Sequence, residues 1–138
     1  MIVRHMKCQV RPGAALVELA LVIPIFFVLF FGMVDISRGF MAKALLDNAA
    51  RVGCRAGILQ GKTNADVQAA ITSAFTGQGI NGTMATITVN GKAVDVSTAV
   101  SGDIVRVVVS VPVKNVTWLP GTGYLTGSLY GTYSLPRA

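Results

Sequence analysis

The stretch RPGAALVELALVIPIFFVLFFGMV, from Arg11 to Val34, decides how the rest of the chain is interpreted. Its apolar run, residues 14–34, would be ~32 Å long as a helix at ~1.5 Å per residue, about the thickness of a bilayer's hydrocarbon core. The run therefore predicts a membrane-spanning helix. Pro24 removes one backbone hydrogen bond and predicts a kink, which membrane helices tolerate. One carboxylate, Glu18, lies near the start of the run and needs an explanation.

The alternative interpretation of this run is a secretory signal peptide, with Arg4, Lys7 and Arg11 as its charged region. The apolar region of a signal peptide is usually roughly 7–15 residues long, which is shorter than this run. In addition, no A-x-A-like cleavage site precedes the rise in polarity at Asp35. We therefore expect a retained membrane anchor.

The charges on either side of the run predict its orientation. Three basic residues precede it, whereas Asp35 and Arg38 follow it and nearly cancel. The positive-inside rule then places the N-terminus in the cytoplasm. The prediction is a basic leader over residues 1–13, a transmembrane helix over 14–34 and a periplasmic or extracellular domain over 35–138.

Length and charge limit the function classes. The chain has 138 residues and a formal net charge of +6, from 12 basic and 6 acidic residues. Three basic residues lie in the leader, so the remainder carries only +3, nine basic minus six acidic. This charge is too weak and too dispersed to predict a nucleic-acid partner. The mean hydropathy of +0.60 is raised by one segment, and the remainder predicts one small domain.

Beyond the membrane the pattern first stays helical. Apolar or small residues recur at helical spacing and predict one stripe of an amphipathic helix continuous with the span: Met41, Leu45, Ala49, Val52, Ala56 and Leu59. Thr63 and Asp66 then form a capping-box pattern that predicts a short second helix ending at Gly77.

The period then changes to that of strands. Asn90-Gly91, between residues 84–89 and 92–96, predicts a two-residue hairpin. Residues 103–113 and 127–135 predict further strands, with Pro112 at an edge or a strand end. The predicted fold class is α+β: a long N-terminal helix, a short helix and a small antiparallel sheet of three to four strands.

The titratable side chains predict no catalytic centre. The single histidine, His5, lies in the leader, and the acidic residues occur singly. The external domain therefore lacks a Ser/His/Asp or Cys/His set and shows no metal-ligand spacing. We expect no enzyme and no cofactor.

The cysteines and the late aromatic residues leave alternatives open. Cys8 and Cys54 would lie on opposite sides of the membrane, so they are not expected to pair within one chain. Burial is favoured for Cys54, with pairing to another chain as the alternative. Packing on the sheet is favoured over a contact surface or a membrane-interface belt for the aromatic residues Trp118, Tyr124, Tyr130 and Tyr133.

The position of Glu18 is similar to that of a glutamate in a known family. Gly13 stands directly before the apolar run and Glu18 five residues later. This spacing resembles class-IV prepilins and pseudopilins, which a membrane aspartyl peptidase cuts after a glycine to leave glutamate as the fifth mature residue. More closely, residues 11–60 resemble the TadE-like family of minor pilins (pseudopilins) of the tight-adherence, or Flp, pilus system. The resemblance is carried by Gly13, Glu18, Pro24, Gly32 and the later stretch NAARVGCRAG.

The resemblance implies cleavage between Gly13 and Ala14 by a prepilin peptidase. The new amine on Ala14 and the Glu18 carboxylate would lie at the same membrane level. Glu18 of one subunit can then pair with a neighbour's amine and fix the axial register of the subunits. Pairing within one chain, or simple solvation of Glu18 near the headgroups, are the alternatives.

The implied function is that of a minor pilin or pseudopilin-like structural component of a Tad/Flp-type pilus or related secretion apparatus. It implies a single-pass protein of the bacterial inner membrane, with the bilayer, other pilins and Tad pilus assembly proteins as partners. The alternative function is an uncleaved, single-pass membrane-anchored binding or adhesion domain in which Glu18 is incidental.

Overall fold

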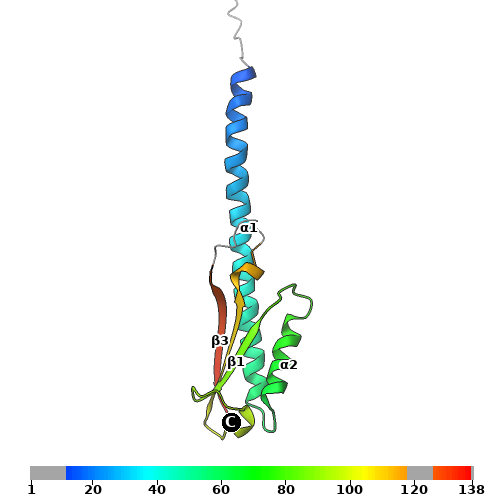
Figure 1. Ribbon diagram of the computed structural model, residues 1–138, viewed down its shortest axis with the longest axis vertical. Helices are drawn as coiled ribbons and strands as arrows, with labels where there is room; N and C mark the ends of the chain where they lie inside the picture. Colours follow the sequence, from blue (N-terminus) through cyan, green and yellow to red (C-terminus); the bar gives the residue numbers. More distant parts are fainter. Residues whose placement is uncertain (1–11, 118–125, 138) are drawn as a thin grey trace, which may run out of the picture. The chain divides into compact units, whose positions relative to one another are not determined.

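The structure is a computed structural model that describes residues 12–117 and 126–137 (Figure 1). It contains two helices, α1 (Pro12–Gly57) and α2 (Asn64–Phe75). Its three strands are β1 (Met84–Val89), β2 (Ile104–Pro112) and β3 (Ser128–Pro136). Two 3-10 turns are η1 (Val96–Thr98) and η2 (Val113–Asn115). The long apolar helix, short helix and three-stranded antiparallel sheet confirm the predicted α+β class.

The chain divides into two compact units, Met1–Val34 and Asp35–Ala138. Helix α1 contributes residues to both, because it continues from Pro12 to Gly57 with Pro24 inside it. Residues 1–11 of the predicted leader, and the aromatic residues Trp118 and Tyr124, lie outside the described residues.

The sheet of the second unit has the strand order β1-β2-β3, and both pairings are antiparallel. Along β2, the valines at alternating positions 105, 107, 109 and 111 are buried, which is the period-two pattern of a strand with one covered face. Pro112 is the last residue of β2, as predicted, where it removes no hydrogen bond from the middle of the sheet.

The predicted hairpin is correct at its turn and wrong in its second strand. Asn90 and Gly91 both have positive φ, 49° and 79°, and the backbones of Val89 and Lys92 exchange two hydrogen bonds of 2.9 Å. Residues 92–96 nevertheless form no strand, and β1 pairs with β2 instead.

Side-chain hydrogen bonds explain why residues 92–96 leave the sheet. The Asp95 carboxylate accepts a hydrogen bond from the Ser97 amide at 2.9 Å and caps η1. The Asn64 amide oxygen accepts from the Val96 amide at 3.1 Å. These bonds hold the segment against the start of α2, because they satisfy backbone groups that a strand would have paired.

The buried face of α1 differs from the predicted stripe. Met41 and Leu59 were placed on that stripe, but they are 69% and 56% exposed. Ala49 is buried as predicted, but the other buried positions are displaced by about one residue and are mostly small: Ala42, Leu46, Ala50, Gly53, Cys54 and Gly57. Small side chains let the helix approach its neighbours closely. A Cβ on Gly53 would lie 2.6 Å from the Ile71 side chain of α2.

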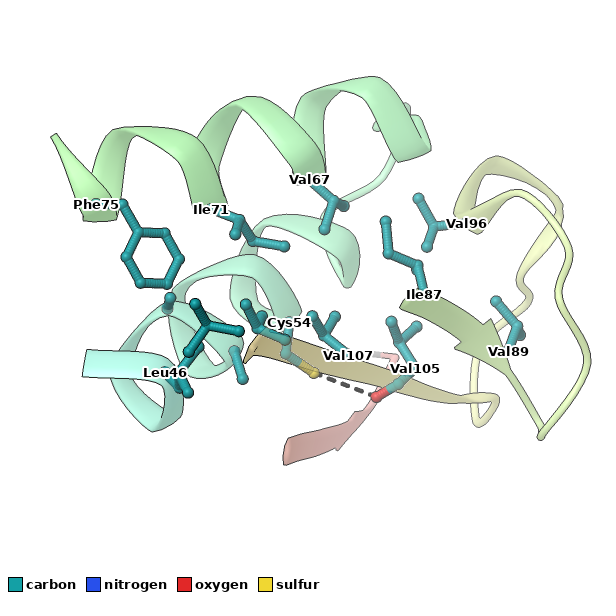
Figure 2. Close-up of a cluster of buried hydrophobic side chains, with 14 of the residues drawn as sticks. Leu46, Cys54, Val67, Ile71, Phe75, Ile87, Val89, Val96, Val105 and Val107 are labelled. Atoms are coloured by element: carbon teal, nitrogen blue, oxygen red, sulfur yellow. Dashed lines mark hydrogen bonds between the residues drawn. The ribbon is translucent and has the colours of Figure 1, made fainter. Parts of the chain in front are cut away.

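The core of the second unit lies between the two helices and one face of the sheet. Figure 2 shows the Val67, Ile71 and Phe75 side chains pointing from α2 toward this core, and all three are buried. Cys54 is completely buried, as expected, and its Sγ donates a hydrogen bond to the Val105 carbonyl oxygen at 3.2 Å (Figure 2). Burial raises the pKa of this thiol.

Candidate assembly segment

The first part of α1 has an apolar surface that the described residues do not cover. All residues from Gly13 to Phe31 are exposed, and Val28, for example, is 71% exposed. The most apolar window of α1 has a mean hydropathy of 2.7 and no buried residue. By length and composition this helix can cross a membrane. Such a surface requires lipid or other apolar helices around it.

The predicted cleavage bond lies in the first turn of α1. We expected the helix to begin after this bond, at Ala14, but it begins at Pro12. Proline fits the first helical position because its missing N–H would have no partner there. Gly13 has open space around it, since a Cβ added to it would meet no atom within 4 Å. The Gly13–Ala14 bond is therefore at a helix end, where backbone hydrogen bonds are incomplete and ends fray.

Glu18 is an exposed carboxylate one helical turn after Ala14. Residues at i and i+4 lie on one face of a helix, so the structure brings these two positions together. Among the residues that the structure describes, none gives the Glu18 side chain a hydrogen bond or an ion pair. The described residues thus leave this carboxylate open to a partner from outside them.

Pro24 lies inside α1, six residues after Glu18 and therefore on a different face. The helix continues through it. The predicted kink at Pro24 stays a prediction.

An aromatic cluster follows Pro24, and sequence reasoning overlooked it. The rings of Phe26 and Phe30 stack with centroids 6.2 Å apart, and those of Phe27 and Phe31 at 6.1 Å. The sequence contains two adjacent Phe-Phe pairs that start four residues apart. Phenylalanines four positions apart lie on one helix face, so this spacing predicts the two stacked pairs. The cluster adds a bulky apolar surface to the second half of the apolar run.

The acidic residues of the second unit stabilise turns and helix ends. Backbone hydrogen bonds lower the pKa of Asp66, Asp95 and Asp103, through Thr63, Ser97 and Val100 respectively. Within residues 12–117 and 126–137, no three histidine, cysteine or carboxylate side chains are grouped to hold a metal ion.

Two of the late aromatic residues lie on β3. Tyr130 is 57% exposed, whereas Tyr133 is half-buried beneath the Arg51 guanidinium, 5.0 Å from its ring centroid. The favoured role in sheet packing is therefore confirmed for Tyr133 and wrong for Tyr130.

The apolar segment and its carboxylate match a known family. A family model described as TadE-like protein matches residues 13–55. No curated protein and no solved structure matches the chain. The matched segment begins at Gly13, contains Glu18 and Pro24 and ends two residues before α1 does. TadE-like proteins are structural pilus components not known as enzymes. The match confirms the TadE-like resemblance over residues 13–55 and supports a Tad pilus-associated component anchored by an apolar helix.

Proposed function

We propose that this chain is a minor pilin or pseudopilin-like structural component of a Tad/Flp-type pilus or related secretion apparatus. In this proposal a prepilin peptidase cuts the chain after Gly13. The observation that carries the proposal is the exposed Glu18 carboxylate near the start of an apolar, membrane-length helix that matches the TadE-like family.

The proposed role of Glu18 follows from the cost of its charge. An acidic residue at the centre of a membrane helix costs about 2.5–3.5 kcal/mol on insertion scales, so a carboxylate in the apolar run is stabilised by pairing. Cleavage after Gly13 creates a positively charged amine on Ala14. Four residues of helix separate Ala14 from Glu18, which is ~6 Å along the axis. Long side chains on a helix point back toward its N-terminus, so Glu18 reaches the level of Ala14.

Pairing between subunits uses this geometry better than pairing within one chain. When membrane helices pack side by side, the Glu18 carboxylate of one subunit lies at the level of the Ala14 amine of its neighbour. The pair neutralises two charges and selects one axial register. Glu18 is thus an assembly residue, and the Gly13–Ala14 bond is the site at which the peptidase creates its partner.

The proposed location is the bacterial inner membrane, with the N-terminus in the cytoplasm and residues 35–138 outside. The partners are the prepilin peptidase, other pilins, Tad pilus assembly proteins and the lipid bilayer. The peptidase acts first, because the amine that pairs with Glu18 does not exist before cleavage.

The Glu18→Gln variant tests this function. Glutamine keeps the size and hydrogen-bonding capacity of glutamate but has no charge. The variant should insert and be cleaved normally, but its crosslinking to pilus proteins and its support of piliation should fall strongly. Glu18→Asp keeps the charge and should retain part of both. Normal crosslinking and piliation in the glutamine variant would contradict the assembly role and favour an anchored binding domain.

A further inference from the structure

The second unit contains two asparagine-glycine pairs in nearly the same sequence context. Ile80 precedes Asn81-Gly82, and Val89 precedes Asn90-Gly91, so a β-branched apolar residue stands before each pair. The two glycines have similar positive φ values, 75° and 79°, and both asparagines are exposed. A difference in reactivity between the two pairs would therefore come from the fold rather than from the local sequence.

An asparagine that precedes a glycine can react with its own main chain. The glycine nitrogen loses its proton and attacks the asparagine Cγ, the Cγ–Nδ2 bond breaks, and ammonia leaves a cyclic succinimide. Water then breaks one of the two C–N bonds of the ring, and the nitrogen regains a proton, which gives aspartate or isoaspartate. Glycine favours this attack because no Cβ obstructs the nitrogen. The side chain has to rotate onto that nitrogen, so a restrained amide is protected.

The fold holds both ends of the Asn90 side-chain amide. Its Nδ2 donates a hydrogen bond to an Asp103 carboxylate oxygen at 2.7 Å, and its Oδ1 accepts one from the Ile104 amide at 2.9 Å. The Asn90 main-chain amide also donates to the Ile104 carbonyl oxygen at 2.9 Å. Rotation of the side chain onto the Gly91 nitrogen would break both side-chain hydrogen bonds, so the fold protects Asn90.

The Asn81 side chain has no such restraint from the residues that the structure describes. None of them forms a hydrogen bond with its side-chain amide, and none accepts one from the Gly82 main-chain amide. The main chain is held instead, because the Asn115 Nδ2 donates to the Asn81 carbonyl oxygen at 2.9 Å. At this pair the attacked side chain and the attacking nitrogen are therefore both available.

We propose that Asn81 deamidates and isomerises spontaneously in the folded chain, whereas Asn90 is protected. The product at position 81 is aspartate or isoaspartate, and either adds one negative charge. In isoaspartate the main chain passes through Cβ and Cγ, which displaces the carbonyl group that Asn115 binds. That form therefore loses the link between the loop before β1 and η2. The inference does not depend on the proposed pilus function, because the reaction uses only residues of the second unit.

Peptide mass spectrometry of the full chain in detergent tests this site. The folded protein is incubated, and the replacement of the side-chain NH2 by OH is followed over time at Asn81 and Asn90. Asn81 should react several-fold faster, and enzymatic methylation should detect isoaspartate at position 81. In urea, where both side chains are free, the two rates should become nearly equal. Equal rates in the folded chain, or an unchanged ratio in urea, would overturn the proposal.

A second experiment removes the protection of Asn90. Asp103→Ala deletes the acceptor of its Nδ2 and should raise the Asn90 rate several-fold. Asp95→Ala is the matched control, because it also deletes a carboxylate that caps a turn but one that does not bind Asn90. The Asn81 rate in the same samples is the reference, since global unfolding would make the two rates equal to those in urea. An unchanged Asn90 rate in Asp103→Ala would contradict protection by this hydrogen bond.

Asn81→Gln tests the consequence for the loop. Glutamine keeps the side-chain amide, but its extra methylene makes the corresponding ring closure much slower, and the exposed position should tolerate it. After incubation, a protease of broad specificity should cut the parent several-fold faster within residues 79–83 than before, whereas Asn81→Gln should not change. The same gain in both proteins, or none in a parent that contains isoaspartate, would overturn the loss of the Asn115 link.

Discussion

Gly131 of β3 lies directly against the backbone of α1 at Leu46. A Cβ added to Gly131 would overlap the Leu46 carbonyl group and lie 2.6 Å from the Asp47 amide nitrogen. The Lys43 ammonium next to this contact donates a hydrogen bond to the Tyr130 carbonyl oxygen at 2.7 Å and pairs with Asp47. The helix and the last strand are therefore joined backbone to backbone, which only a glycine at this position allows.

The first prediction follows from this contact. Gly131→Ala should destabilise the second unit by about 1–3 kcal/mol, because the obstructing atoms belong to a backbone that cannot rotate away. Gly127→Ala is the control, since its nearest neighbour would be a Val113 methyl at 3.9 Å. Urea midpoints of the two variants in detergent should differ clearly. Equal midpoints would show that α1 and β3 are not in close contact.

The second prediction concerns the turn at Asn90-Gly91. Gly91→Val should cost about 1–2 kcal/mol, because a β-branched residue is strained at the positive φ of this position. Lys92→Val introduces the same side chain one residue later, where no positive φ is required, and should be tolerated. Membrane insertion should be unaffected in both. Unchanged resistance to proteolysis in Gly91→Val would argue against the turn.

The third prediction is a pH dependence at Asp103. Its carboxylate accepts hydrogen bonds from the Val100 amide at 2.8 Å and from the Asn90 side chain at 2.7 Å, and these lower its pKa. A lowered folded-state pKa stabilises the fold above the unfolded pKa of about 3.9. This stabilisation is lost as pH falls through the folded-state pKa.

Asp103→Asn isolates this effect from those of Asp66 and Asp95, whose pKa values are also lowered. The variant should be less stable than the parent at pH 7, and the difference should shrink at pH 3. A difference that stays constant with pH would show that the charge of Asp103 contributes nothing.

The fourth prediction concerns processing. Gly13→Leu should leave the leader attached and stop assembly, while the chain still inserts into the membrane. Gly32→Leu is the matched control, because it makes the same replacement far from the bond and should be cleaved normally. Normal processing of Gly13→Leu would rule out cleavage by a prepilin peptidase.

The sequence predicted the fold where a local pattern determines the structure. The apolar run, the capping box at Thr63 and Asp66, and the β-branched strands each depend on near neighbours in the chain, and the structure contains all of them. The expected strand over residues 92–96 was wrong because Asn64, some thirty residues away, binds that segment. The alternation of apolar and polar residues within 92–96 cannot predict a hydrogen bond to a residue so far away in the chain.

The buried face of α1 was displaced for a similar reason. A stripe chosen by side-chain size favoured Met41 and Leu59, but the sheet packs against alanine, glycine and cysteine, because close approach buries more of the helix. For the assembly segment, Glu18 and Pro24 stood out in the sequence because each interrupts an apolar run, whereas the role of Gly13 came from the resemblance to class-IV prepilins. The roles of all three stay predictions. The Phe-Phe pairs passed unnoticed, because within an apolar run they add no contrast in polarity.

The intact mass of the chain extracted from native membranes tests the central claim most directly. We predict the mass of residues 14–138, with one thiol after denaturation, because loss of the leader removes Cys8 and leaves Cys54. A chain that keeps residues 1–13, with both thiols, would contradict cleavage after Gly13 and with it the pairing of Glu18 to a neighbour's new amine.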